Sequence, residues 1–221
     1  MNLHIEQKTD LNDISEILAE SILKQLNLGK KVLWFATGGS SIAIASIVSK
    51  KIAQYPHNNL TVMLTDERYG ELDHPDSNWA QLLTKGFILP DAKLIPILTG
   101  EDRDTTVATF NENLKQELNN ADYKIGLFGV GADGHTAGIL PHSPAVNSEN
   151  LAFCYNSEKF ERITMTPKTI KLLDEGFVYM IGENKWPVID DLKNKDLPLE
   201  TQPVQILKQI PLLTIFSDYN K

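Results

Sequence analysis

Short apolar runs alternate with stretches of helical periodicity along most of the chain, and this alternation constrains the fold more than any other feature. The apolar runs are typical of buried strands and cover residues 32–35, 60–64, 123–128, 176–181 and 212–216. The periodic stretches predict helices over residues 11–28, 41–55, 78–85, 104–118 and 185–192. Such alternation indicates a mostly parallel sheet with helices on both faces. We therefore expect a Rossmann-like α/β fold, with residues 1–221 forming a single domain.

The composition narrows the class of protein. Hydrophobic residues make up 42% of the 221 residues and charged residues 23%, which is enough apolar material for a folded core. A net charge of -8 disfavours nucleic acid as a partner, because phosphate backbones bind basic surfaces. The net charge is compatible with a small phosphorylated ligand, because such a ligand needs only a local cluster of positive groups.

Two further features concern location and redox chemistry. Residues 1–10 contain no apolar signal core, and glycines and serines interrupt the longest uncharged stretch, residues 32–49. We therefore expect a cytoplasmic protein that does not enter a membrane. Cys154 is the single cysteine, which excludes an internal disulfide and a cysteine-based zinc site. Because it follows an apolar run, a buried structural thiol is favoured over a nucleophile.

Polar or glycine-rich clusters follow three of the predicted strands, and in open α/β sheets ligands bind beyond the carboxyl ends of strands. The first cluster includes Gly38, Gly39 and Ser40 and precedes a predicted helix. Adjacent glycines let backbone N–H groups approach a ligand, and a helix N-terminus favours an anion. These three residues are candidates for phosphate binding, and the alternative is a plain turn with Ser40 as N-cap.

The second cluster is Asp66-Glu67-Arg68. Three charges directly after an apolar strand are costly unless they reach solvent, pair with each other or contact a ligand. Arg68 can form two hydrogen bonds to a phosphate or carboxylate. A solvated charged turn is the competing interpretation.

The third cluster covers residues 129–138 and is the most informative. Its glycines match the dinucleotide-binding pattern, but the match lies past mid-chain and Pro141 follows too soon for a long helix, so we reject that interpretation. The spacing of Asp133 and His135 lets the carboxylate orient the imidazole, as in catalytic histidines. A turn with an exposed histidine is the alternative.

Together these motifs resemble those of the 6-phosphogluconolactonase family. The resemblance covers most of the chain in the same order, through residues 38–40, 66–68, 77–78, 129–137, 162–166, 182, 185 and 203–205. Glucosamine-6-phosphate deaminases are similar in fold, but they usually carry other residues at Arg68, Thr136 and Ser77-Asn78. The chain departs from the usual pattern at Gly138, where the family commonly has Ser, at residues 140–142 and at Ser41-Ile42.

The resemblance implies hydrolysis of 6-phospho-D-glucono-1,5-lactone to 6-phosphogluconate in the pentose phosphate pathway, without an organic cofactor or metal. The hypothesis for the mechanism takes His135 as general base, oriented by Asp133, and counts Asp66 among the catalytic candidates. Arg68 stabilises the oxyanion or anchors phosphate, and the sequence does not separate these roles. The remaining candidates for the phosphate pocket are Gly38, Gly39, Ser40, Arg162 and Lys185.

Two alternatives stay open. A sugar-phosphate isomerase or deaminase would use Asp66 as base and His135 for ring opening. A non-catalytic sugar-phosphate sensor normally carries an attached helix-turn-helix domain, and the α/β pattern leaves no residues for one. We expect the protein to act as a monomer or a small homo-oligomer.

Overall fold

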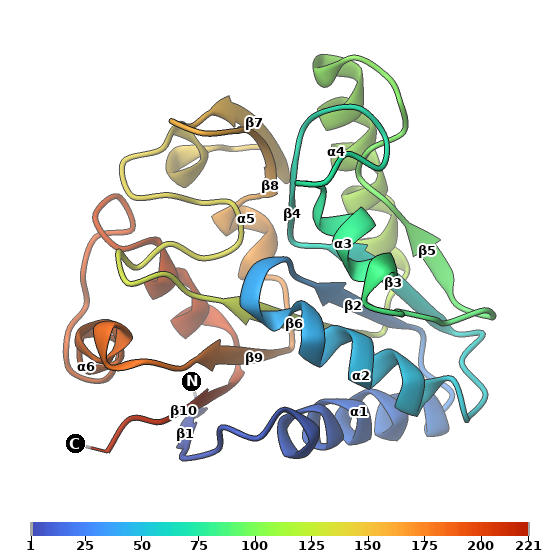
Figure 1. Ribbon diagram of the computed structural model, residues 1–221, viewed down its shortest axis with the longest axis horizontal. Helices are drawn as coiled ribbons and strands as arrows, with labels where there is room; N and C mark the ends of the chain where they lie inside the picture. Colours follow the sequence, from blue (N-terminus) through green and yellow to red (C-terminus); the bar gives the residue numbers. More distant parts are fainter. Residues whose placement is uncertain (1, 221) are drawn as a thin grey trace.

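The computed structural model describes residues 2–220, and its centre is a seven-stranded sheet in which every pair of neighbouring strands is parallel (Figure 1). The strand order is β1-β10-β9-β6-β2-β3-β5. The strands are β1 (Asn2–Glu6), β2 (Val32–Ala36), β3 (Leu60–Leu64), β5 (Lys93–Ile95), β6 (Tyr123–Gly129), β9 (Glu175–Met180) and β10 (Leu212–Ser217). The expected mostly parallel α/β fold is therefore confirmed.

The order of strands creates a switch point between β2 and β6. From β2 the chain moves to β3 and β5 on one side of the sheet, and it returns to β6, β9 and β10 on the other. At such a point the connections diverge, which leaves a crevice at the carboxyl ends of the two strands. All five residues of β2 are buried, as expected for a central parallel strand covered on both faces.

The helices are α1 (Leu11–Asn27), α2 (Ile42–Ile52), α3 (Asn78–Thr84), α4 (Arg103–Asn120), α5 (Pro167–Ile170) and α6 (Trp186–Asn194). Asp10 caps α1, because its carboxylate accepts hydrogen bonds from the backbone N–H groups of Asn12 and Asp13. In the view of Figure 1, α1 and α2 pack together below the large sheet, whereas α4 lies above it.

Helix boundaries differ from the expected ones at two functional positions. Residues Gly39–Ser41 form a short 3₁₀ turn, so α2 begins at Ile42 and Ser40 is not its N-cap. Likewise Lys185 ends the 3₁₀ turn Glu183–Lys185, and α6 begins one residue later, at Trp186. Further 3₁₀ turns cover Pro144–Asn147 and Pro203–Gln209.

A second, antiparallel sheet of three strands was not expected from the sequence. It consists of β4 (Asp66–Arg68), β8 (Glu161–Met165) and β7 (Ala152–Asn156), in the order β4-β8-β7, and it lies above the large sheet in Figure 1. The charged cluster at residues 66–68 is thus a strand rather than a solvated turn. This sheet brings β4, which follows β3 directly, beside a strand from the second half of the chain.

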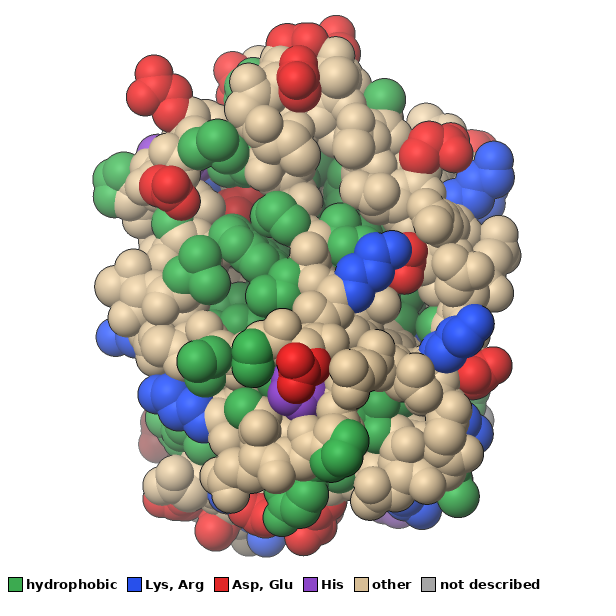
Figure 2. Space-filling model, turned by 90° about the vertical axis from the view of Figure 1, so that its right-hand side faces the viewer, with side chains coloured by type: hydrophobic (Ala, Val, Ile, Leu, Met, Phe, Trp, Pro, Cys, Tyr) green, Lys and Arg blue, Asp and Glu red, His purple; other side chains and the backbone are tan. Residues whose placement is uncertain are grey.

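The face of the molecule on the side of β5 and α4 shows hydrophobic side chains gathered near its middle among scattered charges (Figure 2).

Cys154 on β7 is only half-buried, so the expectation of a buried thiol holds in part. Burial still raises the pKa of this thiol, which disfavours the reactive thiolate. Among the helices described, none is long and apolar enough to cross a membrane.

Candidate active site

A cavity of about 280 Å³ opens at the switch point, beyond the carboxyl ends of β2 and β6. Every candidate residue from the sequence except Asp133 lines it. The lining residues are Thr37, Gly38, Gly39, Ser40, Asp66, Arg68, Asn78, Gly129, Val130, Gly131, His135, Ala137, Arg162 and Lys185. Residues from both sheets therefore meet at the position where the topology predicts a ligand.

Asp133 lies directly behind His135. The Oδ1 atom of Asp133 is 2.6 Å from Nδ1 of the His135 ring and also accepts a hydrogen bond from the His135 backbone N–H at 3.1 Å. A carboxylate only accepts hydrogen bonds, so Nδ1 carries the proton in this contact. The Nε2 lone pair of the neutral ring is then the one that can take a proton.

The loop that carries this pair depends on glycine at two positions. A Cβ atom at Gly131 would lie 2.3 Å from the His135 ring and 2.4 Å from the Asp133 carboxylate, so only glycine leaves room for them. Gly134 adopts a positive φ of 79°, and its N–H donates to the Gly131 carbonyl. The backbone of Gly131 in turn donates to the carbonyl of His135, which closes the loop.

Asp66 is a nearly fully buried carboxyl in the cavity wall. Burial raises its pKa above the ordinary aspartate value, while the Thr65 hydroxyl, which donates to Oδ1 at 2.8 Å, and the nearby Arg162 charge favour the ionised form. Gly138 packs on the same residue, since a Cβ there would lie 3.1 Å from the Asp66 Cβ and 2.9 Å from that of Thr164. The serine that the family commonly has at this position would crowd both side chains.

Glu67, the middle residue of the charged cluster, points away from the cavity and joins β4 to α3. Its carboxylate accepts hydrogen bonds from the backbone N–H groups of Arg68, Asn78 and Trp79 and from the Ser77 hydroxyl, at 2.6–3.0 Å. A carboxylate at a helix N-terminus satisfies N–H groups that lack helical partners. Burial nevertheless raises the Glu67 pKa.

Arg68 and Arg162 are direct partners in the antiparallel β4–β8 pair. Directly opposite residues project from the same face of a sheet, and both guanidinium groups line the cavity. Lys185, which follows β9, is the third cationic side chain in the wall, and burial lowers its pKa below the ordinary lysine value while the Asp218 charge raises it. The cavity of an acidic protein thus has a local excess of positive groups.

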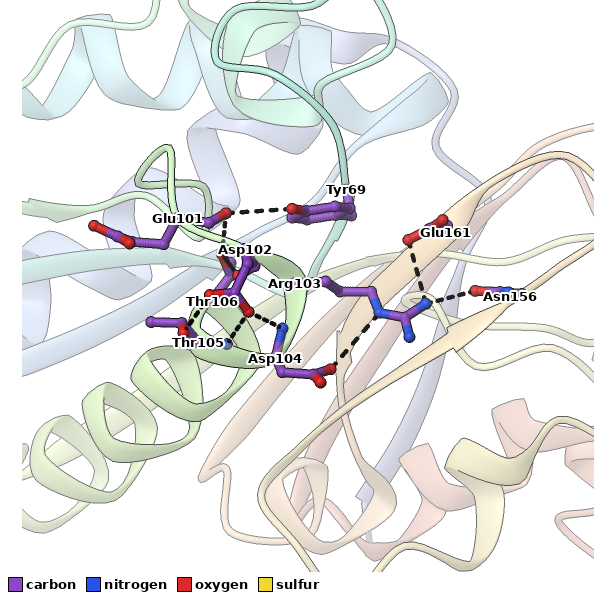
Figure 3. Close-up of polar contacts among 9 residues, drawn as sticks. All are labelled: Tyr69, Glu101, Asp102, Arg103, Asp104, Thr105, Thr106, Asn156 and Glu161. Atoms are coloured by element: carbon purple, nitrogen blue, oxygen red, sulfur yellow. Dashed lines mark hydrogen bonds and ion pairs between the residues drawn. The ribbon is translucent and has the colours of Figure 1, made fainter.

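A polar network anchors the backbone beside the two arginines, at the end of the β4–β8 pair where Tyr69 lies next to Glu161 (Figure 3). Arg103, at the start of α4, donates to the Asn156 side chain at 2.7 Å and to the Glu161 carboxylate at 3.2 Å. Tyr69 donates its hydroxyl to the Glu101 carbonyl at 3.3 Å, and its backbone N–H donates to the Glu161 carbonyl at 2.8 Å. The ends of β4 and β8 are therefore fixed to α4.

Asn78 lines the cavity but was only a motif residue in the sequence, not a candidate for the site. Its side-chain NH₂ donates to the Asp66 carbonyl at 3.0 Å, and a Cβ at Gly38 would lie 2.1 Å from its Oδ1. The Asn78 side chain therefore packs between the glycine loop and β4, and this close approach explains why position 38 requires glycine. The position of Asn78 directly after Ser77, the N-cap of α3, was the available clue.

Arg162 and Thr164 lie two residues apart on β8, opposite Arg68 and Asp66, and so project from the same face of the small sheet, whereas Thr166 lies beyond the strand. Thr164 is fully buried behind the cavity wall, where its hydroxyl accepts from the Gly138 N–H. Thr166 lies beyond β8 at the start of α5, and its hydroxyl donates to the Asn150 carbonyl. Among residues 2–220, no group of three or more His, Cys, Asp or Glu side chains is placed to hold a metal ion.

The fold and the cavity define a Rossmann-like α/β protein with a histidine–aspartate pair and cationic side chains at its switch point. The family described as glucosamine-6-phosphate isomerases/6-phosphogluconolactonase matches residues 8–213, and the chain belongs to this family.

Curated relatives and solved structures are consistent with that assignment. A 6-phosphogluconolactonase of Helicobacter pylori is 24% identical over 223 residues, covering 94% of each chain, and one of Haemophilus influenzae is 26% identical over 78% of this chain and 77% of its own. The match to the Chlamydia pneumoniae 6-phosphogluconolactonase spans 49% of that protein. Among solved structures, the 6-phosphogluconolactonase of Shewanella baltica has a TM-score of 0.82 at 21% identity over 98% of both chains. That of Thermotoga maritima has 0.80 at 20% identity, over 98% of this chain and 99% of its own. At this identity the structural likeness establishes the fold.

Proposed function

We propose that this protein hydrolyses 6-phospho-D-glucono-1,5-lactone to 6-phosphogluconate, a step of the pentose phosphate pathway. The observation that carries the proposal is the 2.6 Å contact between Asp133 and His135 in a cavity that also holds Arg68, Arg162 and Lys185. An oriented base beside a cluster of cations suits an ester carbonyl on a phosphorylated sugar. The names of the curated relatives support the same reaction.

In the proposed mechanism His135 is the general base. Its Nε2 takes a proton from a water molecule while the water oxygen attacks the lactone carbonyl. Asp133 holds the ring in the required tautomer and stabilises the imidazolium that forms. A positioned base of this kind contributes about 10²–10⁴-fold to the rate.

The attack produces a tetrahedral oxyanion, which then collapses. The bond between the carbonyl carbon and the ring oxygen breaks, and the proton on His135 passes to that oxygen, so the product is an open-chain hydroxy acid that ionises to the carboxylate. Cationic groups in the wall stabilise the developing charge because the site is partly shielded from water. Arg68 is the candidate for this task or for binding phosphate.

The phosphate group requires its own donors. Gly39 and Ser40 lie exposed at the 3₁₀ turn that leads into α2, where backbone N–H groups favour an anion. Arg162 and Lys185 supply positive charge from β8 and from the turn after β9. These four residues form the proposed phosphate site, and Gly38 keeps the loop close to Asn78.

The proposal also covers the domain organisation, the location and the oligomeric state of the protein. Residues 1–221 act as one domain, and the enzyme works in the cytoplasm, where phosphorylated sugars are metabolised. It acts as a monomer or a small homo-oligomer. The route above uses water and protein side chains, and it needs no other reactant.

The reaction is tested by following freshly generated lactone by NMR, because the lactone also hydrolyses slowly in water. We expect the protein to accelerate its loss far above the uncatalysed rate and to form 6-phosphogluconate. Loss at the background rate would contradict the proposal.

Deamination or isomerisation of glucosamine 6-phosphate is the second candidate, because the family description includes it and Asp66 lies in the cavity where such a base is required. Ammonia released from glucosamine 6-phosphate would favour it. We expect no ammonia above background.

A further inference from the structure

Arg68 and Arg162 form an unfavourable pair by themselves. They lie directly opposite each other on β4 and β8, where side chains come within about 5 Å of each other at Cβ and like charges repel. Each guanidinium group donates a hydrogen bond to a neighbouring residue. Arg68 donates from Nη1 to the Asp76 carbonyl at 3.0 Å, and Arg162 donates from Nε to the Ser157 hydroxyl at 3.2 Å.

Two carboxylates lie near the pair. The Asp76 carboxylate lies 3.9 Å from the Arg68 guanidinium but is more than half exposed, so water screens it. Asp66 lies in the cavity wall near both guanidinium groups, and burial raises its pKa, while the charges of the two arginines favour its ionised form. Neither carboxylate forms a hydrogen-bonded ion pair with both arginines among the contacts of the described residues.

The ring of Phe160 contacts both guanidinium groups. Its centroid lies 4.6 Å from the guanidinium carbon of Arg68 and 5.8 Å from that of Arg162, and both distances are within the range of cation–π attraction. Phe160 is half-buried at the tip of the β7–β8 hairpin. Ser157 fixes this tip, because its backbone N–H and its hydroxyl both donate to the Phe160 carbonyl at 2.8 Å.

We propose that Phe160 is a positioning residue, whose ring holds the Arg68 and Arg162 side chains together at the cavity. The β7–β8 hairpin therefore contributes to the site through the Phe160 ring and through Ser157. The hydrogen bonds of Arg103 fix the backbone of the strand that carries Arg162. The kinetic part of this proposal rests on the proposed function, whereas the orientation of the arginines does not.

Three variants test the proposal. Phe160→Leu keeps an apolar side chain but removes the π face, so we expect kcat/KM for the lactone to fall about five- to thirtyfold, mainly through KM. Phe160→Tyr keeps the ring and is expected to stay within about twofold of wild type. Phe153→Leu is the control, because Phe153 lies on β7 of the same hairpin but lines a different cavity, beside Val107 and Asn111.

A readout independent of turnover separates this proposal from the proposed function. The Nε–H signals of Arg68 and Arg162 in ¹⁵N NMR are expected to move toward those of free arginine in Phe160→Leu, and to stay unchanged in Phe160→Tyr and Phe153→Leu. Binding of inorganic phosphate is expected to weaken in Phe160→Leu alone. These two measurements remain valid if wild type shows no lactonase activity.

The double variant Phe160→Leu with Arg162→Gln completes a cycle with the two single variants, because a neutral amide cannot make the cation–π contact. We expect the combined loss in phosphate affinity to be smaller than the sum of the two single losses, because each single change already removes the contact between Phe160 and Arg162. Unchanged arginine signals in Phe160→Leu, an equal loss in Phe160→Tyr, or full additivity in the cycle would each overturn the proposal.

Discussion

The Asp133 carboxylate and the His135 imidazole form a contact of 2.6 Å that leaves the opposite ring nitrogen, Nε2, as the proton acceptor. Both residues sit in a loop after β6, beside the switch point of the sheet, so the topology and the chemistry coincide.

Replacing Asp133 by Asn should lower kcat on the order of 10²- to 10⁴-fold with a small change in KM. An amide at this position no longer supports the imidazolium and permits the wrong tautomer. Steady-state kinetics gives the effect on turnover, and ¹⁵N NMR of the His135 ring reports the tautomer. A variant with wild-type kcat would show that Asp133 has no part in catalysis.

Gly131→Ala should displace the pair without altering either functional group. The new Cβ would lie within 2.4 Å of both side chains, so the ring must shift, and a shift of about 1 Å can cost about 10²-fold in rate. The control is Ala132→Ser, at an exposed neighbour in the same loop. Equal activity of Gly131→Ala and the control would contradict the geometry described above.

Asp66→Asn should stabilise the protein at neutral pH while impairing its activity. Burial raises the Asp66 pKa, so the folded state binds a proton more readily than the unfolded state, and stability falls as pH rises from the unfolded pKa near 3.8 through the folded pKa. The amide removes this penalty, so its advantage should be present at pH 7 and should disappear toward pH 4. Urea unfolding across this pH range measures it, and a lower stability of the variant at pH 7 would refute the argument.

Glu67→Gln should destabilise the protein, in contrast to Asp66→Asn, although burial raises the pKa of both carboxyl groups. The two Glu67 oxygens accept four hydrogen bonds, and an NH₂ group in place of one oxygen leaves buried donors unpaired. We expect a loss of about 1–3 kcal/mol in the free energy of unfolding. Denaturation of both variants at pH 7 provides the comparison, and a neutral effect of Glu67→Gln would argue against its role in binding the first backbone N–H groups of α3.

Lys185→Gln should raise KM for the lactone about 10- to 100-fold and change kcat little, as expected for loss of a charged group that binds phosphate. Because burial lowers the Lys185 pKa, its charge is lost at a lower pH than in an ordinary lysine. Wild-type KM should therefore begin to rise at a correspondingly lower pH, and this rise should be absent in the variant. A change confined to kcat would assign Lys185 another role.

The large sheet could be predicted because its longer strands, such as Leu60–Leu64, are continuous apolar runs. The small sheet could not, because β4 is three charged residues and pairs with a strand far away in the sequence. Its stability depends on that pairing and on the hydrogen bonds of Glu67, which local patterns do not reveal. Helix α2 begins later than expected because the 3₁₀ turn Gly39–Ser41 precedes it, and this turn contains Gly39 at a positive φ of 65°.

The candidate site was largely predictable from residues that follow strands, because the carboxyl ends of parallel strands meet at one edge. The sequence motif did not show that the Asp66 side chain lies in the cavity wall. Nor did it show that the adjacent Glu67 side chain points away from the cavity, toward the start of α3. The sequence motifs also did not identify Phe160, whose contact with Arg68 and Arg162 exists only after β4 pairs with β8. The catalytic and binding roles of the site residues remain predictions.

The most direct test of the central claim follows freshly generated 6-phosphogluconolactone by NMR with wild type and His135→Ala in parallel. The account predicts rapid loss with wild type and a rate near background with a variant that is folded by circular dichroism. A folded His135→Ala variant with wild-type turnover would contradict the histidine base, and loss at the background rate with wild type would contradict the proposed reaction itself.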